Sequence, residues 1–426
     1  MNYFDIYTMK LFNRLRNKAQ MFSSLADDHY HTRLMHSLEV NDIAIAIVKR
    51  LKEEYASDIN VQKLDETLIS NIALLHDIGH TPYGHIGERT LHNICSGETK
   101  LFDDVNFKEL GIACGFKHNI NSGLLYKEYL VVHKKEITDF ECKVCDGVMK
   151  HTAIYYKNQD DLDYGFRYVV SGMKGNNQFD IKYDSNPGTN EGLIVSFADE
   201  IAQVSSDYID LKTCEGENKE SDLDGCLIFR QINEKDMREK AKLAANILID
   251  SFVKDYSSDN KKENYENSNF IKMIKNFDMV RSNLIRSNNK IRIHDQIKEA
   301  YIEQLYAYYF ENPLESNDLL IDFIERIKYV SLSDKLRDRI DIIINNNSND
   351  KEKEKELINS FVKEMLRTIY EIGKKQSSIK YSINDRKDFI KIGRTYVRSV
   401  AIDISKMTDG YADHKIKKLT KPFSKK

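Results

Sequence analysis

Histidine and carboxylate side chains concentrate in one short segment of the chain. Residues 74–88, LLHDIGHTPYGHIGE, hold three His, one Asp and one Glu. Eight of the 12 histidines lie between residues 29 and 118. Imidazole nitrogens and carboxylate oxygens bind small divalent cations, and both groups also carry protons in catalysis. The segment therefore indicates metal binding, acid–base chemistry, or both.

The adjacent residues His76 and Asp77 offer one nitrogen and one oxygen donor at the end of an apolar stretch. Two donors hold an ion weakly, so further donors must come from other parts of the chain. His36 precedes one amphipathic segment, and Asp199 interrupts an apolar run in another. If these segments pack together, we expect the four side chains to bind one divalent ion. Mixed nitrogen and oxygen donors favour Mn, Fe, Co, Ni or Mg over a thiolate-type structural zinc.

Each of the four residues also has a common structural role. A His–Asp dipeptide is frequent, a histidine on an apolar helix is usually a hydrogen-bonded core residue, and an aspartate in an apolar run is often a helix cap or an ion-pair partner. Motifs this short match by chance at a high rate. The metal-site hypothesis therefore depends on the combination of the four residues.

Two other spacings suggest chemistry. Glu88 follows His85 by three residues, which on a helix places both on one face, so the carboxylate could orient and charge the imidazole.

Cys142 and Cys145 have a C-x-x-C spacing. We interpret them as two independent thiols, with half of a zinc site completed by a histidine as the alternative. The chain has no G-x-x-x-x-G-K-[ST] loop and no G-x-S-x-G turn, so a P-loop and an α/β-hydrolase serine are unsupported.

The segments that must position these residues have helical periodicity. Apolar side chains recur every three or four residues at 38–51, 68–75 and 193–210. Each run predicts a helix with one buried face. Asp65 is placed to cap the second helix, and Gly79 and Pro82 are placed to end it.

The rest of the chain predicts additional helices. Helical patterns recur at 296–310 and 357–370. The segment 136–187 is less periodic and contains turn residues, so we expect a small hairpin insertion there. We expect a catalytic core over residues 1–215 and a helical C-terminal region over 216–426 packed on it.

Composition agrees with a mainly α protein. The 426 residues carry a net charge of -3, with 31% charged and 41% hydrophobic residues, only 4 Pro and 18 Gly. Few helix breakers and many helix formers favour helices. No run approaches the roughly 20 apolar residues that span a bilayer, and the first thirty residues carry charges throughout, so we expect no membrane contact and no secretory signal. With six Cys expected to be reduced, the sequence predicts a cytoplasmic protein.

Six blocks of sequence, in order along nearly the whole chain, match a known pattern. They are FNRLRNKAQMF (12–22), HYHTRLMHSLEV (29–40), HDIGHTPYGHIGE (76–88), GFKHNINSG (115–123), FADEIAQVSSD (197–207) and ISKMTDGYA (404–412). Together they resemble the HD-domain superfamily of metal-dependent phosphohydrolases, and within it the deoxynucleoside triphosphate triphosphohydrolases, which include dGTPases. A generic HD protein would share only the metal residues, so the combination is specific.

The resemblance implies a helical bundle around one divalent metal ion and assigns roles to particular residues. The implied metal ligands are His36, His76, Asp77 and Asp199. The implied catalytic residues are His80, His85, Glu88 and His118. The implied substrate contacts are Arg33 with a phosphate, and Gln20 and Asp207 with the deoxyribose.

The resemblance also implies a reaction and partners. The family attacks the α-phosphorus of a dNTP and releases deoxynucleoside and tripolyphosphate. Its members are often homo-oligomers, and some are activated by an allosteric nucleotide bound between subunits.

Two other hypotheses remain open. The first is another HD phosphohydrolase, which would act on nucleoside monophosphates, cyclic nucleotides or guanosine tetraphosphate. The second is a sensor that binds nucleotide or, weakly, single-stranded nucleic acid. Loss of metal ligands would mark a sensor, and none of the four is missing. The basic end HKIKKLTKPFSKK is interpreted as a solvated terminus, and an anion-binding tail is the alternative.

Overall fold

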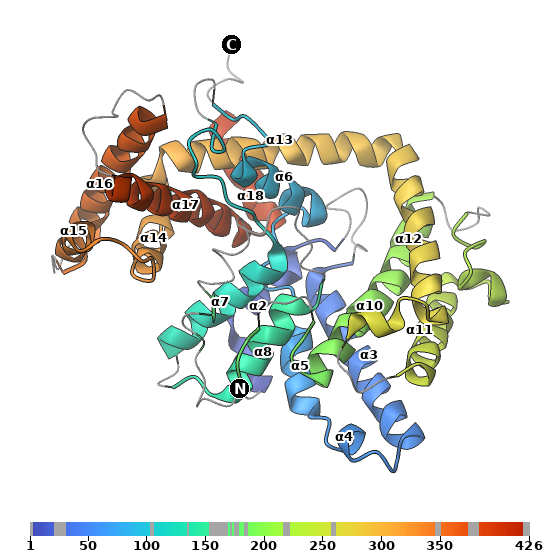
Figure 1. Cartoon of the computed structure of the whole chain (residues 1–426). Coiled ribbons are helices and arrows are strands. Elements are labelled where there is room, and N and C mark those ends of the chain that lie inside the picture. Colours follow the sequence, from blue (N-terminus) through green and yellow to red (C-terminus); the bar gives the residue numbers. More distant parts are fainter. Residues whose placement is uncertain are drawn as a thin grey trace. The chain divides into compact units, whose positions relative to one another are not determined.

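The computed structural model of the chain is built from helices (Figure 1). It describes residues 3–20, 31–102, 106–133, 136–152, 169–170, 173, 179–182, 186–215, 222–256, 261–345, 351–373 and 383–420. Within these ranges no residue belongs to a strand, and one isolated antiparallel bridge joins Ala19 and Thr32. The expected mainly α fold is therefore confirmed.

The chain divides into two compact units, each made of three chain segments. The first comprises Met1–Gly84, His118–Tyr155 and Gly172–Ile297. The second comprises His85–Lys117, Tyr156–Ser171 and Lys298–Lys426. The division into residues 1–215 and 216–426 that we expect from the sequence stays a prediction.

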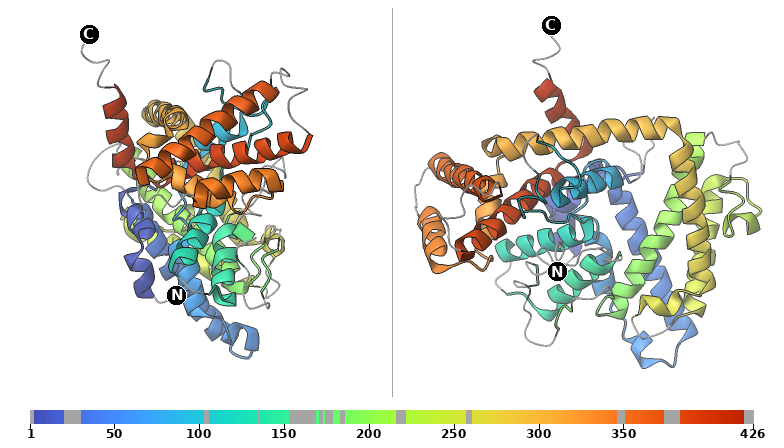
Figure 2. Two further views of the ribbon diagram at one scale, coloured as in Figure 1. Left: turned by 90° about the vertical axis from the view of Figure 1, so that its left-hand side faces the viewer. Right: turned by 45° about the horizontal axis from the view of Figure 1, so that its top comes forward.

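The first unit holds the helices that carry most of the predicted site. Its helices are α1 (Tyr3–Thr8), α2 (Lys10–Arg14), η1 (Leu15–Asn17), α3 (Arg33–Glu54), α4 (Ile59–Gln62), α5 (Glu66–Leu75), α7 (His118–His133), α8 (Asp139–Lys150), α10 (Asn190–Glu215), η2 (Phe229–Gln231), α11 (Met237–Lys254), η3 (Lys262–Tyr265), α12 (Asn269–Ser287) and the first part of α13 (Asn289–Glu311). Helix α3 packs against α5 and α10, and α10 also packs against α5, α8 and α11 (Figures 1 and 2). Three helices distant in sequence therefore meet.

Local sequence signals explain where these helices begin. The Asp65 carboxylate accepts hydrogen bonds from the backbone N–H groups of Thr67 and Leu68, at 2.8 and 3.1 Å, which confirms it as the N-cap of α5. Thr32 caps α3 in the same way, through the N–H of Met35 at 3.3 Å. The three predicted runs of apolar residues are all helical. The runs 38–51 and 193–210 lie within the longer helices α3 and α10, and the run 68–75 ends together with α5 at Leu75.

Two glycines allow close contacts between backbone elements. At Gly79, in the turn after α5, an added Cβ would lie 2.2 Å from the Ser122 backbone nitrogen on α7. At Gly147 on α8, an added Cβ would lie 2.6 Å from Cδ1 of Ile72 on α5. At Gly79 the neighbouring atoms are backbone and exclude a side chain, whereas at Gly147 the Ile72 side chain would have to shift, so glycine allows α5 to lie close to both α7 and α8.

The second unit is helical as well. It contains α6 (Gly84–Ser96), the later part of α13, η4 (Pro313–Glu315), α14 (Leu319–Ile327), α15 (Asp334–Asn345), α16 (Lys351–Gly373), α17 (Ile383–Ser405) and α18 (Asp409–Thr420). Helix α17 packs against α14 and α16. Two buried tyrosines join α13 to α17, because Tyr306 Oη donates to the Val397 carbonyl and Tyr396 Oη to the Phe310 carbonyl, both at 2.8 Å.

The segment 136–187, where we expect a hairpin, begins instead with a helix. Thr138 and Glu141 form a capping box at the start of α8. Most of the residues from 153 to 185 lie outside the described part of the chain, so the hairpin expected there is not described. Within the described residues, every helix is too short or too polar to cross a lipid bilayer.

Candidate metal centre

Three elements of the first unit carry the four predicted metal ligands. His36 lies on the second turn of α3, and His76 and Asp77 follow the last residue of α5 directly. Asp199 lies on α10. All four side chains are buried or largely buried. Because α3, α5 and α10 pack against one another, these residues face a common point although 163 positions separate His36 from Asp199.

The donor atoms lie at distances that suit one shared ion. His36 Nε2 is 2.8 Å from Asp199 Oδ1. His76 Nε2 is 3.7 Å from Asp77 Oδ2 and also 3.7 Å from Asp199 Oδ1. Donors that bind one ion at about 2.0–2.2 Å stand about 3–4 Å apart. The structure therefore brings the four residues together.

The state of His76 fits a metal ligand. Its Nδ1 lies 2.7 Å from the Ala73 carbonyl oxygen, to which it donates, so Nε2 carries a lone pair in the neutral ring. His76 Nε2 is buried and has no hydrogen-bond partner in the described part of the chain. Buried polar atoms are rarely left without a partner. A divalent cation at this point would provide one, and the outer Nδ1–H contact is typical of metal-bound histidine.

The two carboxylates are held in their ionised form. Burial alone would raise the pKa of Asp77, but the Arg33 guanidinium paired with Oδ2 and the neighbouring imidazoles hold it well below its usual range. Burial likewise opposes ionisation of Asp199, and the contacts with His36 and His76 lower its pKa below the ordinary value. Both side chains are therefore anionic at neutral pH, as metal-binding carboxylates must be.

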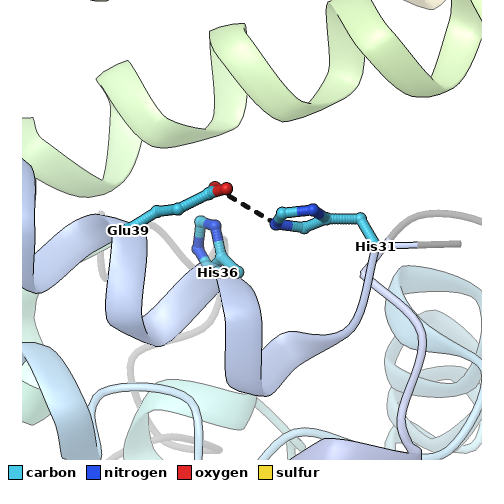
Figure 3. A group of neighbouring side chains, drawn as sticks. All are labelled: His31, His36 and Glu39. Carbon is cyan, nitrogen blue, oxygen red and sulfur yellow. Dashed lines mark ion pairs between the residues drawn. The ribbon is translucent and has the colours of Figure 1, made fainter. Parts of the chain in front are cut away.

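Beside His36 lies a second ion pair, between His31 and Glu39 (Figure 3). His31 precedes α3 and its Nε2 is 3.1 Å from Glu39 Oε2. Burial lowers the pKa of His31, but Glu39, Asp210 and Asp207 outweigh that effect and raise it. His31 therefore has a structural role as the ion-pair partner of Glu39.

His80 and His118 form a stacked pair next to Asp77. Their ring centroids are 4.4 Å apart, and His118 Nε2 is 3.6 Å from Asp77 Oδ1. His80 is buried, and its Nδ1 accepts a hydrogen bond from the Thr81 N–H at 3.1 Å. These two of the four residues that the resemblance implies to be catalytic thus lie beside a predicted metal ligand, and their roles stay predictions.

His151 is a further residue of this cluster that the sequence analysis did not identify. It follows α8 directly, and its ring centroid is 4.9 Å from that of His76. Burial and the nearby His76 lower the pKa of His151 to about 3, so its imidazole is neutral. The capping box of Thr138 and Glu141 is visible in the sequence and marks the start of α8. A helix of ordinary length from that point would have placed His151 at its end.

Arg33 and Gln20 lie next to the cluster. Arg33 Nη2 donates to the Gln20 carbonyl at 3.1 Å, and Nη1 pairs with Asp77. The Gln20 residue is 4% exposed, and its Oε1 has no hydrogen-bond partner among the described residues. Such an acceptor requires a donor from a ligand or a water molecule. The proximity of both residues to the site is consistent with the substrate contacts implied by the resemblance, which stay predictions.

Asp207 has a protein partner of its own. It is buried on α10, and Arg281 Nη1 on α12 lies 2.5 Å from its Oδ2. Arg281 Nη2 also pairs with Asp278 Oδ1 at 3.0 Å. Pairing with a cation is a structural role for Asp207, and the deoxyribose contact that the resemblance implies stays a prediction. Nothing in the sequence signals Arg281, which is 74 positions away.

His85 and Glu88 belong to the second unit, on α6. His85 Nδ1 lies 3.9 Å from Glu88 Oε2, with the imidazole 57% exposed and the carboxylate largely buried. The expected placement on one helix face is therefore confirmed.

The pair of thiols Cys142 and Cys145 is buried within α8 in the first unit. Neither thiol belongs to any group of potential metal ligands in the described part of the chain.

Comparison with known proteins gives the family of this centre. Residues 33–203 match the model of the HD domain. Three relatives are named deoxyguanosinetriphosphate triphosphohydrolase-like protein. One from Geobacter metallireducens is 31% identical over 263 residues, which are 58% of this chain and 55% of the relative. One from Wolinella succinogenes is 33% identical over 47% of this chain and 45% of the relative. One from Rickettsia prowazekii is 34% identical over 47% and 43%.

The matches confirm the resemblance that the sequence blocks indicate. The chain spans about half the length of the curated relatives it matches. The matched residues 33–203 include all four donors as well as His80, His118 and His151. Residues 33–203 are thus an HD domain, in a chain similar to deoxyguanosinetriphosphate triphosphohydrolase-like proteins over about half of its length.

Proposed function

We propose that this chain is a metal-dependent hydrolase of deoxynucleoside triphosphates that releases deoxynucleoside and tripolyphosphate. The observation that carries the proposal is the convergence of His36, His76, Asp77 and Asp199 within an HD domain. The names of the relatives, which match about half of this chain, support a nucleotide substrate.

The cluster has the donor set that this chemistry needs. Two imidazole nitrogens and two carboxylate oxygens would hold a divalent ion such as Mn, Mg, Fe, Co or Ni. When bound, such an ion polarises a phosphoryl oxygen and lowers the pKa of coordinated water. Arg33 pairs with Asp77 and so favours its ionised form, and it would offer its remaining guanidinium N–H groups to a phosphate. Lys18 Nζ donates a hydrogen bond to the His80 carbonyl. Lys18 therefore stabilises the turn after α5, which carries His76 and Asp77.

Hydrolysis at the α-phosphorus needs a proton for the leaving 5′ oxygen. His118 lies beside Asp77 and would donate that proton, or accept one from the attacking water, because an imidazole can act as a general acid or base near neutral pH. In the second unit, the Glu88 carboxylate lies 3.9 Å from Nδ1 of the exposed His85 imidazole and would orient that ring. We assign His85 to leaving-group or water contacts, with Glu88 as its carboxylate partner.

The test is direct product analysis. The protein is incubated with each dNTP and with Mn²⁺ or Mg²⁺, singly and in mixtures, and the products are separated by ion exchange. Tripolyphosphate with free deoxynucleoside is the expected outcome, and Asp77→Asn should produce neither. Release of orthophosphate or pyrophosphate, or turnover only of nucleoside monophosphates, cyclic nucleotides or guanosine tetraphosphate, would instead support another HD phosphohydrolase.

Mixtures of nucleotides serve a second purpose. We propose a homo-oligomer whose activity responds to a bound nucleotide, as the family resemblance implies. Activity on one dNTP that appears only when a second dNTP is present would support that arrangement. Sedimentation with and without nucleotide would show whether the oligomer forms.

A further inference from the structure

His151 is held in place by contacts at both its ring and its backbone. Its ring Nδ1 lies 2.7 Å from the Val148 carbonyl oxygen. Its own carbonyl oxygen accepts hydrogen bonds from Ser196 Oγ at 2.5 Å and from Lys262 Nζ at 3.0 Å. A side chain that is 2% exposed and anchored in this way has one defined orientation. The question is what its remaining nitrogen does.

The ring contact fixes which nitrogen carries the proton. A carbonyl only accepts, so His151 Nδ1 must be the donor and, in the neutral ring, Nε2 must carry the lone pair. That Nε2 lies 3.2 Å from His118 Nε2. The ring centroids are 5.3 Å apart, farther than the two nitrogens by about two ring radii, so the two Nε2 atoms point toward each other. His118 must therefore donate its Nε2–H to His151.

Without that acceptor, His118 would have a competing partner. Asp77 Oδ1 lies 3.6 Å from the same Nε2 atom, and a carboxylate is the stronger acceptor for an imidazole N–H. The two distances from His118 Nε2, 3.2 Å to His151 Nε2 and 3.6 Å to Asp77 Oδ1, are so similar that a small change in the side-chain torsions would exchange the two partners. A hydrogen bond from His118 to Oδ1 would then compete for the carboxylate that the metal needs.

We propose that His151 is a positioning residue: it accepts a hydrogen bond from His118 Nε2–H and so holds the His118 imidazole away from Asp77. The inference rests on the proposed function, in which His118 transfers a proton. The geometry also allows another arrangement, in which Asp77, His118 and His151 bind one cation together. Metal content separates the two.

A double-mutant cycle tests the proposal on the full chain. His151→Ala, His118→Ala and the double variant are compared with wild type, and His133→Ala on the exposed end of α7 is the control. We expect His151→Ala to lower kcat about 10–100-fold with little change in KM, as is typical for residues that orient groups in an active site. His151→Gln, which keeps an acceptor at similar reach, should recover most of the loss.

The cycle has a result that would overturn the proposal. If His151 acts through His118, adding His151→Ala to His118→Ala should cost less than about threefold, because the two residues form one unit. An additive loss would show that His151 acts independently. Two metal ions per wild-type chain, of which His151→Ala loses one, would show that His151 is a ligand.

A spectroscopic readout keeps the inference separate from the proposed activity. Long-range ¹H–¹⁵N spectra of the metal-free protein with ¹⁵N-labelled histidine report which ring nitrogen is protonated. We expect Nδ1–H for His151 and Nε2–H for His118, with the His118 signals shifted in His151→Ala and unchanged in His133→Ala. The opposite tautomers would overturn the proposal even in an active enzyme. The expected tautomers in a protein that makes no tripolyphosphate would refute only the proposed function.

Discussion

At the scale of single residues, Asp77 has two oxygens with different surroundings. Oδ2 faces Arg33 and His76, and Oδ1 faces His118. An amide in place of the carboxylate removes the negative charge that an ion requires and leaves Arg33 without its partner. Asp77 is therefore the residue whose isosteric replacement tests the metal site most directly.

We expect Asp77→Asn to lower bound metal from about one ion per chain to below about a tenth of that after dialysis, since losing one of few donors weakens binding strongly. Turnover should fall with the metal. Mass-spectrometric metal analysis of the purified variants measures this, and Asp250→Asn, at an exposed aspartate on α11, is the control. Full occupancy in Asp77→Asn would remove Asp77 from the ligands.

Glu200, next to Asp199, gives a pH-dependent prediction. Burial and the charges of Asp199 and Asp278 raise its pKa from 4.5 to about 7. A carboxyl group whose pKa is higher in the folded than in the unfolded protein stabilises the fold when it is protonated. The contribution of Glu200 to the free energy of unfolding is therefore complete below pH 4.5 and is lost as the pH rises through about 7.

Glu200→Gln should remove this dependence in the metal-free protein. Relative to wild type, the variant should gain up to about 3 kcal/mol in the free energy of unfolding between about pH 5 and pH 8. Denaturant unfolding across that range measures the difference, with the exposed Glu325→Gln as control. A constant difference at every pH would contradict the raised pKa.

At the scale of elements, the turn after α5 is as important as the ligands it carries. It brings His76 and Asp77 to the start of α7, where His118 lies, only because Gly79 has no side chain. The contact is with backbone atoms of Asn121 and Ser122, which cannot move aside without displacing α7.

Gly79→Ala should therefore lower the free energy of unfolding by at least about 2 kcal/mol, as overpacking against rigid atoms does. The matched change Gly410→Ala on α18, where an added Cβ meets nothing within 4 Å, should alter it by less than about 1 kcal/mol. Thermal melting of both variants measures the contrast. Equal melting temperatures would mean that the turn can shift.

The helices that carry His36, His76 and Asp199 could be predicted because each has its own apolar period and, for α5, its own cap. Periodicity is local information, so it identified the elements, while the donors were identified by their residue types and by the resemblance. His151 was missed because it lies past the end of α8, in a segment where the apolar pattern is weak. The Asp207–Arg281 pair depends on the packing of α10 against α12, which no local pattern contains.

At the scale of the whole molecule, the metal would connect three elements of the first unit. Ligands on α3, after α5 and on α10 come from separate parts of the chain, so an ion bound to all of them favours the folded state alone. A free ion concentration of 100 times the Kd would add about 2.7 kcal/mol to the free energy of unfolding.

We expect the melting temperature to rise with added Mn²⁺ and to fall on chelation. Asp77→Asn should melt at the same temperature with and without the ion. Differential scanning calorimetry measures both, and Ca²⁺, which prefers more oxygen ligands, serves as the comparison ion. An Asp77→Asn protein stabilised by Mn²⁺ as much as the wild type would place the stabilising ion elsewhere.

The contact of Gly147 with Ile72 has a consequence for how this sequence tolerates change. Ile72 is one helical turn before His76, and Gly147 is one turn before His151, so this contact sets the separation of the two histidines. In a library of all single substitutions selected for activity, position 147 should therefore be depleted as severely as a ligand position. The positions that tolerate no substitution would then include a residue that contacts neither the substrate nor the metal ion and takes no part in proton transfer.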